Sequence, residues 1–367
     1  MKTISLELRA PRLRRRLRRV RLGRKSSELK IIFMGAGDFA LPILEALIKS
    51  QSSPVLVITN PDKPGGRHRI ITPPLVKQLA QKYKIPVLQP EKIKDISPEL
   101  RTPRQRRVRL GRKSPELIIV AAYGQILPQE ILKVPHFGCL NIHPSLLPKY
   151  RGPSPIPSAI LEGEKKTGIS IILMAKKMDA GPILAQKEIE IKTNDTAETL
   201  SKKLSQLGAK ILLDIIPKWI KGEIKPASQD EKRASYTKIL KKEDGHISWS
   251  KPALEIERQI RAYFFWPGSY TYWRQVTSDP STRLRAGKRQ GFKKLIKIKK
   301  AKILHPKIGC ADNSTPGYVF LTAQKKLAVN CQPGSIYIEK LQLEGKKAMT
   351  AKEFLNGHPE IIGSILQ

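Results

Sequence analysis

Three polar side chains, an amide, an imidazole and a carboxylate, occur at points in the chain where they could act together. Asn141 and His143 alternate with apolar residues in LNIHPSLLPKYRG at 140–152, and a proline follows His143 directly. Because side chains alternate along a strand, both polar groups share one face and emerge where the strand ends. Asp179 lies in MDAGPI, a Gly-Pro turn that follows a later apolar stretch. Brought together, they would supply an amide donor, an imidazole and a carboxylate that orients it, which suits acid–base chemistry.

Each of these residues also has a structural interpretation. An asparagine at a strand end commonly caps a turn, a single histidine is commonly a satisfied structural residue, and an aspartate before Ala-Gly-Pro is typical of a turn. Residue spacing alone favours the structural interpretation over the catalytic one, and both stay open at this point.

The elements that must position these residues form an alternating pattern. Short apolar strands are predicted at 30–34, 54–58, 86–88, 117–121 and 138–142, followed by two further strands at 167–173 and 183–191. Helical segments separate the first of these strands, which indicates parallel pairing with helices on both faces. The predicted fold is therefore α/β, with a Rossmann-like, mostly parallel sheet. In such sheets ligands bind beyond the carboxyl ends of the strands, where Asn141 and His143 are expected.

A glycine-rich loop, GAGDFA at 35–40, follows the first strand and fits the loose form of a dinucleotide-binding motif. A nicotinamide site also needs an acid at the end of the second strand, but that strand ends in Thr59 and Asn60. We therefore interpret the glycines as a tight turn that allows close packing of strand and helix.

The net charge of +38 is extreme, and much of it lies in two related segments. RRVRLGRKS occurs at 18–26 and again at 106–114. We expect residues 1–29 to form a basic N-terminal extension and residues 101–117 to be a basic insert in a catalytic domain at 30–220. Solvated surface is the favoured interpretation of both. The three cysteines are far apart, which argues against a zinc ribbon or a disulfide framework, and no apolar run is long enough to span a membrane.

The second half of the chain changes texture. A long helix is expected at 195–222, with Asp195 and Glu198 as its capping box, and a linker at 221–234. From residue 235, short strands separated by Gly, Pro and Asn predict a C-terminal domain at 235–367 that contains a small OB-like β-barrel. Its first strand is expected at 246–249.

Several motifs together resemble those of the folate-dependent formyltransferases. They are FMGAGDFALPILEAL, AAYGQILP, LNIHPSLLPKYRGPSPI, MDAGPI, KILKKEDGHISW and RAYFFWPGSY. The resemblance extends from residue 30 to about 273, apart from the insert. It implies a formyl transfer from 10-formyltetrahydrofolate that needs no metal. It also implies that Asn141, His143 and Asp179 are catalytic, and that the folate site is lined by Ser145, Leu146, Leu147 and Pro148.

Within that family the motifs most resemble those of members that act on initiator methionyl-tRNA. Lys63, Arg67 and Arg69 lie in a basic, Gly-containing loop that would contact the tRNA, because cationic side chains neutralise phosphates. We expect a monomeric, cytoplasmic enzyme. Two alternatives remain: a folate-dependent formyltransferase acting on a small-molecule amine, and a non-catalytic RNA-binding protein. The basic loop and second domain argue against the first, and the intact Asn, His and Asp argue against the second.

Overall fold

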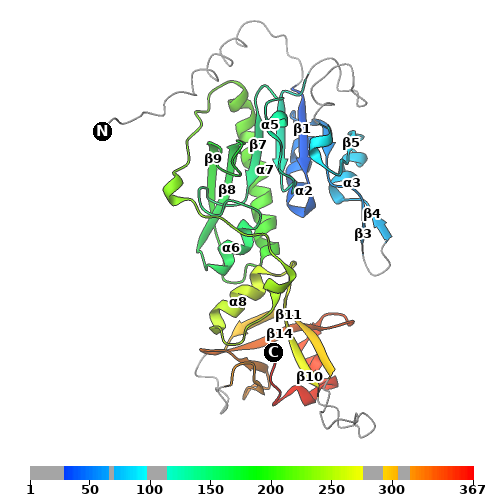
Figure 1. The fold of residues 1–367 in the computed structure, drawn as a ribbon, viewed down its shortest axis with the longest axis vertical. Coiled ribbons are helices and arrows are strands. Elements are labelled where there is room, and N and C mark those ends of the chain that lie inside the picture. The colour runs from blue at the N-terminus through cyan, green and yellow to red at the C-terminus, as the bar shows by residue number, and fades with distance from the viewer. Residues whose placement is uncertain (1–28, 66–69, 97–113, 276–291, 305–314) are drawn as a thin grey trace, which may run out of the picture. The chain divides into compact units, whose positions relative to one another are not determined.

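The structure is a computed structural model, and it describes residues 29–65, 70–96, 114–275, 292–304 and 315–367 (Figure 1). Contacts divide the chain into two compact units. The first consists of Met1–His143, Ile169–Lys187 and Ser205–Glu231, and the second of Pro144–Gly168, Glu188–Leu204 and Lys232–Gln367. The N-terminal basic copy and most of the insert lie outside the described residues. The domain boundaries expected at 220 and 235 stay predictions.

In the described part of the chain, seven strands form one mostly parallel sheet in the order β5-β2-β1-β6-β7-β8-β9 (Figure 1). Their bounds are β1 (Ile31–Gly35), β2 (Pro54–Ile58), β5 (Val87–Leu88), β6 (Leu117–Ala121), β7 (Cys139–His143), β8 (Lys166–Leu173) and β9 (Ile183–Glu190). The first five pair in parallel, and β8 runs antiparallel to β7. The predicted α/β fold is confirmed, and the apolar runs that predict β1, β6 and β7 are the buried centre of the sheet.

Helix α2 (Gly37–Ile48) packs on this sheet where small residues allow a close approach. The described α-helices are α2 (Gly37–Ile48), α3 (Leu75–Lys82), α5 (Gln129–Leu132), α6 (Pro155–Leu161), α7 (Ala197–Ile220), α8 (Ala253–Ala262) and α9 (Ala351–Gly357). A Cβ atom on Gly35 would lie 2.5 Å from the Phe33 ring and 2.9 Å from the Cβ of Ala40. The glycine-rich loop thus permits close packing of β1 against α2, as the sequence predicts.

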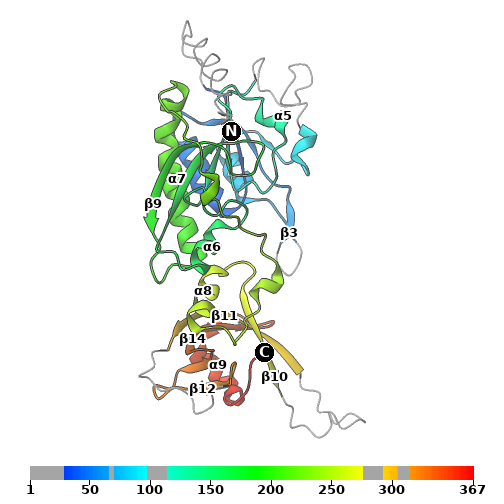
Figure 2. The same ribbon diagram turned by 60° about the vertical axis from the view of Figure 1, so that its left-hand side comes forward.

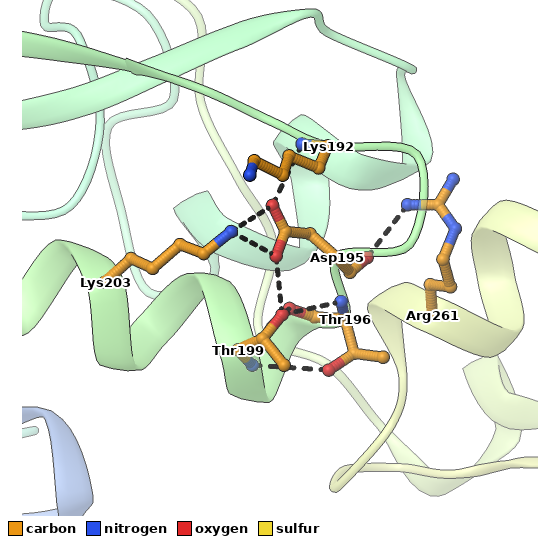
Figure 3. Close-up of polar contacts among 6 residues, drawn as sticks. All are labelled: Lys192, Asp195, Thr196, Thr199, Lys203 and Arg261. Carbon is orange, nitrogen blue, oxygen red and sulfur yellow. Dashed lines mark hydrogen bonds and ion pairs between the residues drawn. The ribbon is translucent and has the colours of Figure 1, made fainter.

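The N-terminus of α7 differs from the prediction in one respect (Figure 3). The reciprocal cap is made by Thr196 and Thr199, not by Asp195 and Glu198: each threonine hydroxyl accepts a hydrogen bond from the other's backbone N–H, at 3.3 and 3.0 Å. The helix begins one residue later than a cap at Asp195 requires, so the N3 position falls on Thr199. Asp195 is freed from capping, and its buried carboxylate binds other groups instead.

Asp195 is the centre of a polar network in the second unit (Figure 3). Its carboxylate accepts hydrogen bonds from Nζ of Lys203 at 2.7 and 2.8 Å, from the Thr199 hydroxyl at 2.8 Å and from the Lys192 backbone N–H at 2.9 Å. Nη1 of Arg261 donates to the Asp195 carbonyl oxygen at 3.0 Å. Since Arg261 belongs to α8, the network joins α8 to the loop that precedes α7.

The second unit also contains an antiparallel sheet, in the part of the chain where the sequence predicts a small OB-like β-barrel (Figure 2). Its order is β10-β11-β14-β13-β12, with β15 paired to β14; the bounds are β10 (Ser269–Gln275), β11 (Phe292–Ile303), β12 (Val319–Leu321), β13 (Leu327–Asn330), β14 (Ser335–Leu343) and β15 (Met349–Thr350). The last residues of the chain pair at both edges of this sheet: Ile365 pairs with Tyr318, next to β12, and Leu366 pairs with Trp273 of β10. The expected strand at 246–249 is wrong: its residues follow the 3-10 helix η3 (Lys242–Gly245), and His246 makes an isolated bridge to Tyr270.

No helix among the described residues combines the length and the apolar character that crossing a membrane requires.

Candidate active site

Strand β7 places Asn141 and His143 on one face of the sheet. Cys139, two residues before Asn141, packs into the apolar cluster on that face together with residues of β1 and β6. Ile142 points to the opposite face, where α7 approaches so closely that a Cβ on Gly208 would lie 2.8 Å from it. The alternation predicted from the sequence is therefore confirmed, and it fixes both polar side chains at the carboxyl end of a buried strand.

Asp179 lies in a tight turn between β8 and β9. Its backbone is in the left-handed region, with φ of +49°, a conformation that Asp and Asn tolerate better than most residues. Two residues later, Gly181 has no room for a side chain, because the carbonyl group of Leu173 lies against it. The backbone N–H of Leu173 donates to the Pro182 carbonyl at 3.0 Å, which holds the turn on the end of β8.

The three predicted catalytic side chains meet. The Asn141 amide nitrogen donates to Oδ1 of Asp179 at 3.2 Å, and Nδ1 of His143 lies 3.6 Å from Oδ2 of the same carboxylate. His143 and Asp179 are nearly buried. The amide of Asn141 has a second N–H, and a protonated imidazole such as that of His143 donates from both ring nitrogens. The arrangement can hold an oxyanion and accept a proton.

One residue that sequence reasoning missed supports this turn. The Gln229 side-chain amide donates to the carbonyl oxygens of Asp179 and Gly181, each at 2.7 Å. Its segment is held in place by Ala227, which exchanges two backbone hydrogen bonds with Ile183 at 2.7 and 2.8 Å. The polar stretch expected to be a linker is thus paired to the start of β9. No local motif marks Gln229, because its role arises from a pairing 44 residues away in sequence (227 against 183).

The predicted folate-lining residues follow directly on β7 in sequence and belong to the second unit. Ser145 is fully buried, and its hydroxyl donates to the Lys149 carbonyl at 2.7 Å. Leu147 is buried, Leu146 and Pro148 are partly buried, and the Leu147–Pro148 peptide bond is cis. The Pro148 carbonyl accepts from the Ser235 backbone N–H at 3.3 Å. The segment is therefore a compact loop, and its contact with folate stays a prediction.

Of the predicted tRNA-contacting residues, one is described. Lys63 begins the hairpin of β3 (Lys63–Gly65) and β4 (Ile70–Thr72) and is exposed. Arg67 and Arg69 lie between these strands, outside the described residues. The base of the hairpin is anchored by Asp62, which accepts hydrogen bonds from Gln89 and Lys77, each at 2.6 Å. The hydrogen bond from Gln89 has the larger effect and that from Lys77 the smaller, and together they hold the pKa of Asp62 below its ordinary value.

Comparison with known proteins identifies both parts of the chain. Residues 29–216 match the family described as Formyl transferase, and residues 239–359 match its C-terminal domain. A methionyl-tRNA formyltransferase of Caldicellulosiruptor saccharolyticus is 39% identical over 339 residues, which cover 92% of this chain and 100% of that protein. One of Chloroflexus aurantiacus is 48% identical over 246 residues, covering 67% of this chain and 77% of that protein.

Solved structures share the fold. HypX from Aquifex aeolicus in complex with tetrahydrofolic acid matches with a TM-score of 0.55 and 16% identity over 92% of this chain and 48% of that one. An N-formyltransferase from Helicobacter canadensis, in complex with folinic acid and dTDP-3-aminofucose, matches with a TM-score of 0.54 and 20% identity over 84% of this chain and 98% of that one. At these identities the likeness shows the fold alone.

Proposed function

Because the chain belongs to the formyltransferase family, we propose that it transfers the formyl group of 10-formyltetrahydrofolate to the amino group of methionyl-initiator tRNA. The supporting observation is that relatives named methionyl-tRNA formyltransferase align with 89–92% of this chain at 38–40% identity. Such a reaction prepares the initiator for translation, which takes place in the cytoplasm.

The geometry of Asn141, His143 and Asp179 suits this reaction. The amine nitrogen attacks the formyl carbon, a new C–N bond forms, and the carbonyl oxygen gains negative charge. The second N–H of Asn141 and a protonated His143 can donate to that oxygen, and each such donor lowers the barrier by about 2.7–4 kcal/mol. Asp179 stabilises the charged imidazole across 3.6 Å and helps to accept the proton that the amine loses. When the carbonyl re-forms, the bond to the folate N10 breaks and that nitrogen takes up a proton.

Each substrate has a candidate binding segment. Ser145, Leu146, Leu147 and Pro148 form the loop that we assign to the folate, with Leu146 and Leu147 as the apolar wall for the pterin. We assign the basic segment that contains Lys63, Arg67 and Arg69 to the tRNA backbone. If this assignment holds, Arg67→Ala raises the KM for methionyl-tRNA and leaves formyl-donor binding unchanged. A fall in donor binding with unaltered tRNA kinetics would move the hairpin to the folate site.

The test uses a radiolabelled formyl donor and three acceptors: charged initiator tRNA, the same tRNA without methionine, and free methionine or amino-sugar nucleotides. We expect label on charged initiator tRNA and none on the other acceptors. Label on a small amine in preference to tRNA would favour the small-molecule alternative. Tight RNA binding without any transfer would favour the non-catalytic alternative, and Asp179→Asn supplies the matched inactive control.

A further inference from the structure

Large apolar side chains are exposed in one part of the second unit. Phe265 is 60% exposed, Trp266 57%, Tyr236 57% and Ile239 74%. Phe265 and Trp266 follow α8, and Tyr236 and Ile239 lie in the segment that leads to η3. We call Phe265 and Trp266, together with the segment 236–240, the aromatic platform. Trp266 contacts this segment at Leu240, and large apolar side chains exposed together are typical of a binding surface.

The platform is held rigidly. The indole N–H of Trp266 donates to the Leu240 carbonyl at 3.0 Å, so the polar edge of the ring is satisfied while more than half of the side chain remains exposed. The segment is fixed again at Gly245, which has no room for a side chain because the Gly268 carbonyl lies against it. Phe265 packs edge-to-face with Phe264, with ring centroids 5.4 Å apart. A ring fixed in this way loses little conformational entropy when a flat ligand stacks on it.

Charge shows which kind of partner fits. Residues 232–242, which include the segment under Trp266, contain five Lys or Arg and no Asp or Glu. Lys238 of this group pairs with Asp244, and a protein partner's apolar face would supply no anion to the group as a whole. RNA offers both required chemistries, because its phosphates are anionic and its unpaired bases present flat faces. Interleaved aromatic and basic side chains are typical of surfaces that bind single-stranded nucleic acid.

We propose that the aromatic platform stacks unpaired nucleotides at the 3′ end of the tRNA, with Trp266 and Phe265 as the stacking residues. This proposal rests on the proposed function, in which the reacting amino acid is attached to that unpaired end. The platform acts by positioning, since neither ring carries a group that can take part in formyl transfer. Stacking tolerates any base, so the platform contributes affinity for an unpaired end without selecting its sequence.

The protein contains its own reporter for this contact. Of its four tryptophans, Trp219, Trp249 and Trp273 are buried, between 1% and 4% exposed, and only Trp266 is strongly exposed. We expect uncharged initiator tRNA to quench the iodide-accessible part of the tryptophan emission of the full-length protein. Trp266→Phe should remove that change. A tRNA shortened by its unpaired 3′ nucleotides should bind but leave the emission unaltered.

Kinetics supply a test that does not depend on fluorescence. Phe265→Ala and Trp266→Leu should each raise the KM for methionyl-tRNA roughly ten-fold, with kcat and the KM for the formyl donor unchanged. Trp266→Phe, which keeps an aromatic face, should retain most of the wild-type KM. Leu254→Ala, an exposed apolar residue of α8 in the same unit, is the matched control and should change nothing.

Three results would overturn the proposal while the proposed function stands. The first is an unchanged KM in both Phe265→Ala and Trp266→Leu, and the second is equal quenching by intact and shortened tRNA. The third is a tryptophan emission that no RNA alters, which would indicate that this face binds a protein partner instead. A wild-type enzyme that formylates no methionyl-tRNA would instead contradict the proposed function, whatever the fluorescence shows.

Discussion

A buried aspartate and a partly buried one are held in opposite ways in this molecule. Asp195 faces the ammonium group of Lys203 at 2.7 and 2.8 Å and also accepts from a hydroxyl and a backbone N–H (Figure 3). Asp179 faces an amide at 3.2 Å and an imidazole at 3.6 Å, and a glutamine holds its backbone in a left-handed conformation. The first carboxylate is bound by short, charge-assisted contacts, and these two contacts of the second are longer and involve a neutral amide and an imidazole, whose charge can change.

We propose that the difference separates a structural carboxylate from a reactive one. Burial alone would raise the pKa of Asp195, but the bonds from Lys203, Thr199 and the Lys192 backbone outweigh it and hold the pKa below 3.8. A carboxylate stabilised as an anion in this way is a poor proton acceptor near neutral pH. Asp179 instead lies beside an imidazole that can carry charge in a transition state. A strong ion pair therefore marks the aspartate that joins α8 to α7, and a looser contact marks the candidate catalytic one.

The largest expected effect is on turnover at the looser site. Asp179→Asn should lower kcat by two or more orders of magnitude, because the amide cannot stabilise a charged His143 or take a proton. Asparagine tolerates the left-handed backbone at this position, so the free energy of unfolding should change by less than about 1 kcal/mol. His143→Ala should lower kcat to a similar extent while folate binding is retained. Unchanged turnover in either variant would remove the residue from the mechanism.

Asp195→Asn should show the reverse pattern. It removes the charge from a saturated buried site, so the free energy of unfolding at pH 7 should fall by about 2–3 kcal/mol. At a temperature where the variant is folded, kcat should stay close to the wild-type value. Urea unfolding measured alongside single-turnover formylation separates the two effects. A variant that keeps its stability but loses turnover would erase the distinction between the two aspartates.

The pH dependence of stability sharpens the same comparison. Because the pKa of Asp195 is lower in the folded than in the unfolded protein, its contribution is complete above about pH 5. It is lost as pH falls through the folded-state pKa, which lies below 3.8. The stability difference between wild type and Asp195→Asn should therefore shrink between pH 5 and pH 2. A difference that stays constant over this range would show that the carboxylate is not held as an anion.

A smaller effect is expected from the residue that supports the Asp179 turn. Gln229→Leu removes the hydrogen bonds to the carbonyls of Asp179 and Gly181 and should lower kcat about ten-fold, with both KM values little changed. Gln186→Leu is the matched control, since its amide donates at 2.8 Å to Ser170 between strands β9 and β8. Equal losses of kcat in the two variants would mean that Gln229 only contributes to stability.

The sequence predicts elements better than it predicts contacts between distant segments. Apolar runs and their spacing locate β1, β6 and β7 because burial of a whole strand is a local property of sequence. The positions of Asn141, His143 and Asp179 can be predicted because a strand end and a Gly-Pro turn are local signals, whereas their catalytic role comes from the family resemblance and stays a prediction. Gln229 is not found, since its position depends on Ala227 pairing with Ile183. The same limit explains the false strand at 246–249, where tertiary packing replaces pairing along the segment.

The smallest expected effect on stability comes from the N-terminal cap of α7. The sequence predicts this cap one residue too early, at Asp195 in place of Thr196. If Thr196 and Thr199 form the reciprocal cap, Thr196→Ala should lower the free energy of unfolding by about 1 kcal/mol. Glu198→Gln removes one exposed charge from the first turn and should cost only about 0.3 kcal/mol through the helix dipole. Urea unfolding of both variants at pH 7, with m-values checked for equality, measures the difference. Because Glu198 would be the N3 partner if Asp195 were the cap, a larger loss in Glu198→Gln than in Thr196→Ala would return Asp195 to the capping role. The contrast between the two aspartates would then weaken, since part of what binds Asp195 would be an ordinary helix cap.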